Sequence, residues 1–270
     1  MHPDLWQQEV LERVCDPQSR RIAVKAGHGV GKTACASVAL IWFILTRYPC
    51  KAVVTAPTSG QLTNGLWPEL VHNIQNLPEG LKDLLDVTSD RVRLKADPAG
   101  AFISAAVARA ESPEALAGVH SDHVLLIVDE SSAVPRAVFN SSGGSMAGGD
   151  ATMMLLGNPT RTDGLFFDIF DQDLEDWHKM TVPCTASGRD LSAFVREMAA
   201  LYGEDSSEYR IRVLGEFPLS QEEGLIPLGL LEAAQDREVE PSLGPVSVGV
   251  DIARFGGDSS AAVVRQGNQV

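Results

Sequence analysis

Little in this sequence points to a membrane or to an oxidising compartment. The longest largely apolar run, Ala34 to Leu45, has 12 residues, whereas a helix needs about 20 to cross a bilayer. The first residues, Met1 to Leu5, lack the basic start and the apolar core of a signal peptide. The four cysteines form no C-x-x-C pair, so we expect reduced thiols in a cytosol. The chain is therefore expected to be soluble, with no membrane partner.

Negative charge is plentiful but concentrated in two stretches. The formal net charge of −14 by itself argues against a polyanionic partner. Residues 204–240 contribute −7 of it, and residues 163–176 hold six acids without a lysine or arginine. The rest of the chain is nearly neutral, so net charge neither supports nor excludes a nucleic-acid partner.

A glycine-rich loop between a predicted strand, Arg21–Val24, and a predicted helix, from Thr33 to about Leu45, is the most informative stretch. Glycines let backbone N–H groups turn inward to hold phosphate oxygens, and the helix adds its positive end. The spacing A-x-x-x-x-G-K-T predicts that Lys32 reaches the β and γ phosphates of ATP and that Thr33 binds Mg²⁺. The expected nucleotide-binding loop comprises Ala26, Gly27, His28, Gly29, Val30, Gly31, Lys32 and Thr33.

One residue of this loop departs from the commonest pattern. Ala26 stands where glycine is commoner, which is tolerable only if that position does not need a positive φ. The alternative interpretation is a glycine-rich turn with a chance Gly-Lys-Thr. The strand before the loop and the helix after it favour the phosphate-binding interpretation.

An acidic pair follows the uninterrupted apolar run Val124–Val128, which is typical of a strand buried on both faces of a parallel sheet. A carboxylate at such a strand end can hold Mg²⁺ through water, and this is the role expected of Asp129. Glu130 is expected to orient a water for in-line attack on the γ-phosphate. An acidic turn without catalytic function is the alternative.

Three further residues have two interpretations each. Asn158 follows another predicted strand and is expected to sense the γ-phosphate through its amide, or else to be a turn residue before a proline. Trp6 and Gln7 are candidates for clasping an adenine by stacking and by paired amide hydrogen bonds. Packing at the start of a helix is the alternative for both.

An arginine that neutralises developing charge often accelerates such hydrolysis. Arg109, upstream of the Asp129 strand, and Arg161, just beyond Asn158, are the candidates. Either could equally be a surface arginine.

The order of elements predicts an α/β fold: a P-loop NTPase of the ASCE type, with a mainly parallel sheet flanked by helices and the site at its carboxyl edge. We expect an ATPase core at 1–185, a helical lid subdomain and linker at 186–244, and the start of an incomplete second domain at 245–270. Asp251, at the end of a predicted strand, would suit a metal site of a two-metal nuclease. Such a site needs carboxylates from later elements, so this chain is not expected to cleave DNA.

Taken together, these residues resemble the large terminase subunit of tailed bacteriophages, the motor that packages viral DNA. The motifs in chain order are Trp6-Gln7, the loop Ala26–Thr33, Thr55-Ala56-Pro57-Thr58 with Gln61, Leu116–His120, Ile127–Glu130, Gly157–Thr160, Gly215–Pro218 and Gly249–Ala253. Each motif is weak alone, but the order is specific.

The resemblance implies an N-terminal packaging ATPase, followed at 245–270 by the first strands of an RNase H-like nuclease that is cut short here. It implies that Trp6 and Gln7 match the adenine-binding element, that Asn158 lies in the motif coupling hydrolysis to movement, and that Asp251 matches the first nuclease carboxylate. The implied partners are double-stranded DNA, the portal protein and the small terminase subunit. The implied setting is a homo-oligomeric ring docked transiently on a procapsid in the host cytoplasm.

Two other functions share features with a packaging motor. A helicase-type translocase shares the phosphate loop and the Asp-Glu pair, but it needs a second motor domain that residues 190–270 are too few to form. A non-catalytic fragment that binds DNA or the portal is the second alternative, since hydrolysis in a ring can require an arginine from a neighbour.

Overall fold

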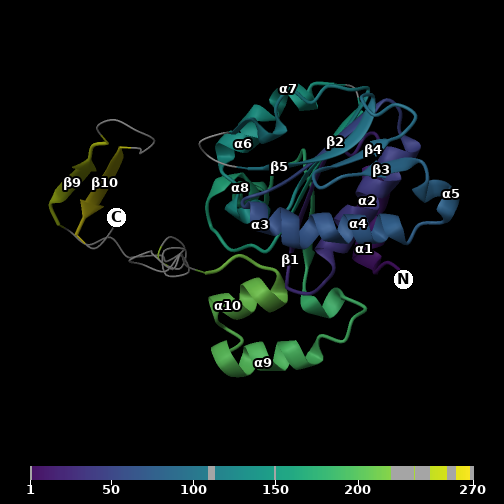
Figure 1. Ribbon diagram of the computed structural model, residues 1–270. Coiled ribbons are helices and arrows are strands. Elements are labelled where there is room, and N and C mark those ends of the chain that lie inside the picture. Colours follow the sequence, from purple (N-terminus) through teal and green to yellow (C-terminus); the bar gives the residue numbers. More distant parts are fainter. Residues whose placement is uncertain are drawn as a thin grey trace. The chain divides into compact units, whose positions relative to one another are not determined.

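The computed structural model describes residues 2–108, 113–148, 150–219, 234, 244–253 and 260–267 (Figure 1). They fall into two compact units, Met1–Gln221 and Glu222–Val270, and each unit is described by itself. Within the described residues, no helix combines the length and the apolar character needed to cross a membrane.

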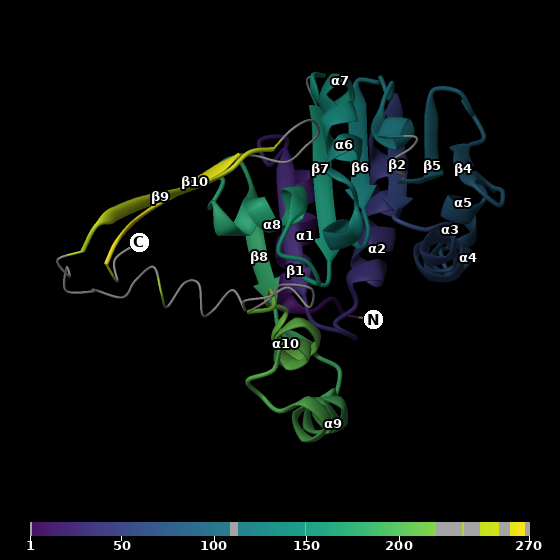
Figure 2. The same ribbon diagram turned by 90° about the vertical axis from the view of Figure 1, so that its left-hand side faces the viewer.

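The first unit is built on an eight-stranded sheet in the order β3-β4-β5-β2-β6-β7-β1-β8 (Figure 2). The six strands from β5 to β8 in this order run parallel, whereas β4 is antiparallel to both β5 and β3. The strand bounds are β1 (Arg21–Ala26), β2 (Cys50–Ala56), β3 (Leu85–Val87), β4 (Arg91–Leu94), β5 (Ala101–Val107), β6 (His123–Val128), β7 (Asp150–Gly157) and β8 (His178–Val182). The predicted, mainly parallel α/β fold is confirmed.

Helices cover both faces of this sheet. The α-helices are α1 (Leu5–Cys15), α2 (Lys32–Thr46), α3 (Ser59–Gln61), α4 (Trp67–Gln75), α5 (Glu79–Lys82), α6 (Arg136–Ser141), α7 (Gly143–Met146), α8 (Gly164–Asp171), α9 (Ser192–Tyr202) and α10 (Ser207–Tyr209). Short 3₁₀ turns occur at Pro113–Leu116, Ser131–Ala133 and Cys184–Ala186, and π-helical turns at Leu62–Leu66 and Arg210–Leu214.

Strand alternation divides the core between the two faces. Neighbouring residues of a strand point to opposite faces, so a strand buried on both sides feeds two cores. In β6, Ile127 joins the core formed with α1, α2 and α4, whereas Leu126 joins the core formed with α6 and α8. The apolar run that predicted a doubly buried strand is thus explained by helices on both faces.

The sequence pattern from Gln61 to Leu77 predicts a helix interrupted at Pro68, and the structure divides this stretch. A π-helical turn at Leu62–Leu66 separates α3 from α4, and Pro68 lies in the first turn of α4. Proline is tolerated there because its missing N–H has no partner within the helix. The predicted interruption at Pro68 is confirmed, and its physical cause is the start of a new helix.

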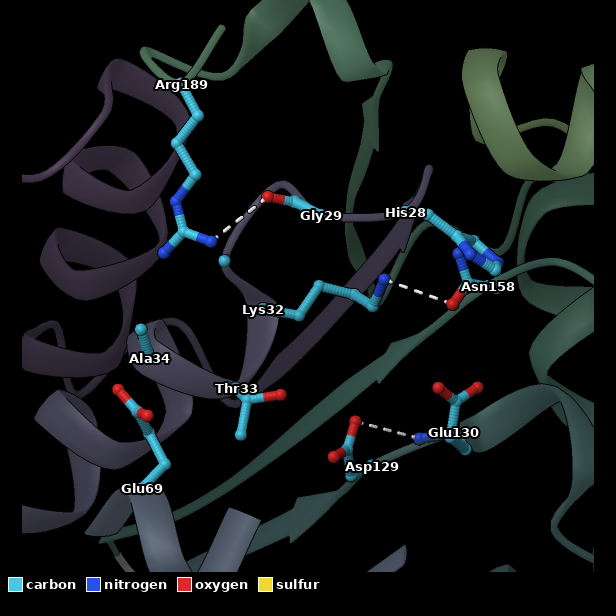
Figure 3. Close-up of a pocket in the computed structure, with 11 residues that line it drawn as sticks. His28, Gly29, Lys32, Thr33, Ala34, Glu69, Asp129, Glu130, Asn158 and Arg189 are labelled. Atoms are coloured by element: carbon cyan, nitrogen blue, oxygen red, sulfur yellow. Dashed lines mark hydrogen bonds between the residues drawn. The ribbon is translucent and has the colours of Figure 1, made fainter. Parts of the chain in front are cut away.

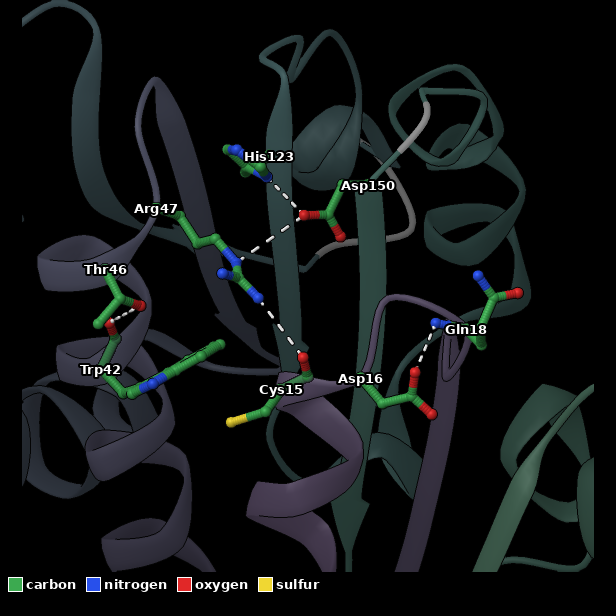
Figure 4. Close-up of polar contacts among 8 residues, drawn as sticks. All are labelled: Cys15, Asp16, Gln18, Trp42, Thr46, Arg47, His123 and Asp150. Atoms are coloured by element: carbon green, nitrogen blue, oxygen red, sulfur yellow. Dashed lines mark hydrogen bonds and ion pairs between the residues drawn. The ribbon is translucent and has the colours of Figure 1, made fainter.

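The amino-terminal edge of the sheet is tied together by polar contacts (Figure 4). Asp150, at the start of β7, lies 2.5 Å from His123 Nδ1 at the start of β6, and the same carboxylate oxygen lies 3.9 Å from Arg47 Nε. Arg47 also donates to the carbonyl of Cys15 at the end of α1, at 3.4 Å. These contacts join the carboxyl ends of α1 and α2 to the first residues of two central strands.

β8 ends at the carboxyl edge of the sheet, and the chain that follows stays at this edge. We call this part, residues 184–218, the return segment. It contains α9 and α10, which lie beyond the carboxyl ends of β1 and β8 in both views (Figure 1, Figure 2). The His28 N–H donates to the Arg212 carbonyl at 2.7 Å, so the return segment is bonded to the glycine-rich loop. Gly215, with φ +68°, is packed so closely that an added Cβ would lie 2.8 Å from Gly27 N.

The second unit contains a described antiparallel hairpin, β9 (Val246–Asp251) with β10 (Ala261–Gln266). The sequence pattern predicts strands at 246–251 and 260–265, close to these bounds. Their valines are more than 45% exposed, so this ribbon buries little apolar surface by itself. That it begins an RNase H-like domain, and that a domain boundary lies at residue 186, both stay predictions.

We expect Gly215→Ala to destabilise the first unit by about 2–4 kcal/mol, combining the cost of a left-handed conformation with a clash against the glycine-rich loop. Gly118 provides the matched control, because it has the same φ of +68° but open space where a Cβ would lie. Gly118→Ala should therefore cost only the conformational part, about 1–2 kcal/mol. Urea unfolding of both variants measures the difference, and equal losses would contradict a close packing role for Gly215.

Candidate active site

A pocket of about 390 Å³ opens at the carboxyl edge of the sheet, beside the first turn of α2 (Figure 3). Its volume is within the range of small-molecule sites. The lining residues come from the loop after β1, from α4, from the ends of β6 and β7, and from the return segment. They are His28, Gly29, Gly31, Lys32, Thr33, Ala34, Glu69, Asp129, Glu130, Asn158 and Arg189.

The glycine-rich loop adopts the backbone that its sequence requires. Gly29 and Gly31 have φ values of +73° and +90°, which side-chain-bearing residues rarely adopt. Ala26 ends β1, is fully buried and is not among the residues with positive φ, so an alanine is tolerated there. Val30 points into the core at 1% exposure, which anchors the loop between its glycines.

Lys32 is buried and turned toward the loop and the end of β7. Its Nζ donates to the Gly27 carbonyl at 3.0 Å and to Asn158 Oδ1 at 3.2 Å. Burial lowers the pKa of this ammonium, and the carboxylates of Glu130 and Asp129 partly offset that effect. A buried cation whose charge is only partly balanced attracts an anionic ligand.

Asp129 carries the opposite imbalance at the end of β6. It is 8% exposed, and burial, followed by the charge of Glu130, raises the pKa of its carboxyl to about 6. The backbone N–H of Glu130 donates to its Oδ1 at 3.0 Å and favours the ionised form, as does nearby Lys32. A bound cation would stabilise the ionised carboxylate further.

Glu130 adopts a left-handed backbone conformation, with φ 51° and ψ 44°. Such a conformation costs a residue with a Cβ about 1–2 kcal/mol. Close packing holds it in place, because a Cβ on Gly157 would lie 3.0 Å from Ser131 N and 3.5 Å from the Glu130 carbonyl carbon. Strain of this kind concentrates at functional sites, and here it turns the glutamate toward the pocket (Figure 3).

Asn158 joins the end of β7 to the glycine-rich loop. It is 6% exposed, and besides accepting from Lys32 it donates to the Ala26 carbonyl at 2.6 Å. It is therefore more than a plain turn residue, although its role as a γ-phosphate sensor stays a prediction. Any ligand that draws Lys32 away also removes one of its two partners.

Arg161 lies near this site but does not line the pocket. Its side chain is exposed, and its backbone N–H donates to Ser132 Oγ at 3.0 Å. The same hydroxyl accepts from Thr160 N at 3.1 Å, so Ser132 fixes the loop after β7 to the turn after Glu130. The other arginine candidate, Arg109, lies outside the described residues.

Gln7 and Trp6 belong to α1, and their positions differ. Gln7 Nε2 donates to the Gly31 carbonyl at 3.1 Å, and its Oε1 accepts from Asp4 N at 2.9 Å, so the side chain joins the helix start to the loop. Trp6 is 6% exposed and belongs to the apolar core, and it is not among the pocket-lining residues. The packing alternative therefore describes Trp6, and stacking on an adenine has no support from its position.

Sequence reasoning missed three pocket residues: Ala34, which directly follows the predicted loop, and two distant residues, Glu69 and Arg189. Glu69 lies in the first turn of α4, after the π-helical turn, and accepts a hydrogen bond from Asn73 at 3.2 Å. Arg189 belongs to the return segment, about 160 residues after the loop that its guanidinium contacts. No local pattern signals either residue, because only the fold brings them to the pocket.

Of the remaining candidates, His28 lines the pocket and Asp251 belongs to the second unit. His28 stacks on Phe194 with ring centroids 6.2 Å apart, and burial, with Lys32 and Arg212 nearby, lowers its pKa. Asp251 ends β9 and is exposed. Across the described part of the chain, no three His, Cys, Asp or Glu side chains are grouped as a metal site.

Comparison with known proteins gives a consistent result. No family model matches the chain. It is 27% identical over 258 residues to the probable terminase, large subunit, of Enterobacteria phage P7, covering 88% of this chain and 51% of that protein. The chain thus spans about half the length of this relative.

Two solved structures share the fold. The Thermus phage P74-26 large terminase ATPase domain matches with a TM-score of 0.57 and 17% identity, covering 80% of this chain and 99% of that one. The large terminase of a second, thermophilic bacteriophage, in complex with ADP, matches with a TM-score of 0.62 and 15% identity, covering 97% and 64%. The chain is therefore similar in sequence to a phage large terminase subunit, and its sheet-bearing unit has the fold of large terminase ATPase domains.

Proposed function

We propose that this chain contains the ATP-hydrolysing motor of a phage large terminase, which drives double-stranded DNA into a procapsid. The observation that carries the proposal is the pocket at the carboxyl edge of the sheet. It brings together a glycine-rich loop, a buried lysine and two acidic residues, the groups that phosphoryl transfer to water requires. The large terminase of the thermophilic bacteriophage is a fold neighbour solved in complex with ADP, which supports a nucleotide as the ligand.

Each residue has a distinct part in the proposed reaction. The free backbone N–H groups of the loop and the N-terminus of α2 hold the phosphates. Lys32, released from Gly27 and Asn158, neutralises charge on the β and γ phosphates. Glu130, held at the pocket by its strained backbone, orients a water for in-line attack and accepts its proton.

The residues present fit a magnesium ion as the metal cofactor. Asp129 is a buried carboxylate with a raised pKa, and Thr33 offers a hydroxyl from the first turn of α2. Magnesium is commonly held by one or two protein oxygens together with substrate phosphates and waters, so a dedicated protein cage is not required. When bound, the ion would neutralise charge developing on the phosphoryl oxygens.

The wider assignment is a proposal drawn from the homology and the sequence motifs. It comprises a homo-oligomeric ring on the procapsid in the host cytoplasm, with the portal protein and the small terminase subunit as partners. Asn158 would couple hydrolysis to movement, because it contacts both Lys32 and the backbone of Ala26. Arg161 and Arg109 remain candidates for the charge-neutralising arginine.

Asp129→Asn should stabilise the nucleotide-free chain at pH 8 by about 1–3 kcal/mol. Burial raises the pKa of Asp129 from 3.8 to about 6, so the ionised carboxylate opposes folding. The stability present with the neutral acid is lost as the pH rises through about 6, whereas asparagine is neutral throughout. Urea unfolding without metal should show that Asp129→Asn raises the free energy of unfolding above that of the wild type, by more at pH 8 than at pH 5. A gain that does not change with pH would contradict the explanation.

Lys32→Ala and Glu130→Gln should separate binding from turnover. We expect Lys32→Ala to lose ATP binding, because the triphosphate loses its buried cation. We expect Glu130→Gln to bind ATP as the wild type does and to hydrolyse it at least about a hundredfold more slowly. Calorimetric titration with ATP and Mg²⁺, followed by steady-state phosphate release, measures both. Tight binding by the lysine variant, or appreciable turnover by the glutamine variant, would contradict the assigned roles.

The motor role predicts how turnover responds to neighbours and to DNA. We expect ATP hydrolysis per chain to rise with protein concentration and with linear double-stranded DNA, because a ring places an arginine of one subunit beside the pocket of the next. Steady-state hydrolysis over a wide concentration range, with and without DNA, tests this. Flat, DNA-independent turnover would leave an ATPase without evidence of a motor, and no turnover would favour a binding-only fragment.

A further inference from the structure

Hydrogen bonds to both its guanidinium and its backbone hold Arg189 at the pocket. Its Nη1 donates to the Gly29 carbonyl at 3.3 Å. Its backbone is held by a chain of hydrogen bonds that begins at Asp4: Gly188 N donates to Asp4 Oδ1 at 2.9 Å, and Ser187 Oγ links Asp4 to Arg189 N. An otherwise exposed arginine is thus fixed beside the glycine-rich loop.

The pocket has two chemically different ends (Figure 3). Glu130 and Asn158 lie at one end, where Lys32 Nζ also points, and this is the end for the terminal phosphate. Arg189, Ala34 and Glu69 lie at the other end of the pocket. A nucleotide with its γ-phosphate at Glu130 therefore extends its nucleoside toward Arg189.

The nucleoside end needs a flat surface for a base, and Arg189 provides the planar group there. Among the described lining residues, the one aromatic ring is that of His28, which lies at the phosphate end and stacks on Phe194. Trp6 is enclosed in the core. A guanidinium plane stacks well on aromatic faces, and a lysine ammonium does not reproduce this.

The position of the guanidinium also separates this role from phosphate binding. It lies on the carbonyl side of the loop, at Gly29, whereas phosphates are held by the inward-turned N–H groups and by Lys32. Gly31 allows Gln7 and Arg189 to approach the loop closely, because a Cβ there would lie 2.9 Å from Gln7 Nε2 and 3.6 Å from Arg189 Nη2.

We propose that Arg189 is the base-stacking residue of this site: its guanidinium plane lies against the purine of the bound nucleotide. The inference rests on the proposed ATP-binding function and extends it to a residue of the return segment. A bound nucleotide would then contact both the return segment and the core, because Arg189 would touch the nucleoside while it donates to the Gly29 carbonyl.

The test compares ATP with inorganic tripolyphosphate, which has the same phosphates and no nucleoside. With Mg²⁺ present, calorimetric titration of Arg189→Ala should show ATP and ADP binding about three- to tenfold weaker and tripolyphosphate binding unchanged. Arg189→Lys should lose as much ATP affinity as alanine does, since it keeps the charge but not the plane. In hydrolysis assays, KM for ATP should rise while kcat is kept.

Arg13→Ala, which removes an exposed arginine near the end of α1, is the control and should bind both ligands like the wild type. Equal losses for ATP and tripolyphosphate, full rescue by lysine, or no loss in Arg189→Ala would each overturn base stacking. A wild-type chain that binds neither ligand would instead contradict the proposed function itself. Matching urea unfolding curves for the nucleotide-free variants would show that altered affinity does not reflect misfolding.

Discussion

The parallel pairing of β6, β7 and β1 is the constraint on which the rest of the site depends. Parallel strands end at the same edge of a sheet, so the residues that follow them meet whatever their separation in sequence. The glycine-rich loop follows β1, the Asp129-Glu130 pair follows β6, and Asn158 follows β7. Slipping one of these strands by a residue would turn its buried side chains to the opposite core, and the two packed faces of the sheet prevent that.

The charges of Lys32 and Asp129, at the carboxyl edge of the sheet, are incompletely balanced in the chain by itself. Lys32 is a buried cation with a lowered pKa, and Asp129 is a buried acid with a raised one. The charged form of each side chain is disfavoured by the same cause, loss of hydration. Each charged form would be stabilised by a ligand that the proposed function requires. The triphosphate would neutralise the lysine, and the magnesium ion the carboxylate. The site therefore gives up some stability in the ligand-free chain to gain affinity.

The return segment is as much a part of the site as the strand ends. It donates no residue to the central sheet, yet its backbone accepts from His28, its Gly215 touches Gly27, and its Arg189 reaches Gly29. Because of these contacts, movement of the glycine-rich loop would displace the return segment, which contains α9 and α10. In the proposed motor, this direct contact would link nucleotide binding to displacement of another element.

The glycine spacing, the Asp-Glu pair and the doubly apolar strands are local patterns whose geometry follows from backbone freedom and strand periodicity. They were sufficient to predict the parallel fold, the loop between β1 and α2, and the carboxylates beside it. Sequence alone thus determined the parts of this protein whose function depends on neighbours within a few positions.

Only the tertiary structure decided the parts that depend on distant neighbours. Trp6 is a core residue because α1 packs on α2, and Gln7 binds the loop because the same packing brings it to Gly31. Glu69 and Arg189 line the pocket without any local motif. Their roles arise from side chains converging across about 35 to 160 positions, and such convergence is set by packing of whole elements, which leaves no periodic signal in the chain.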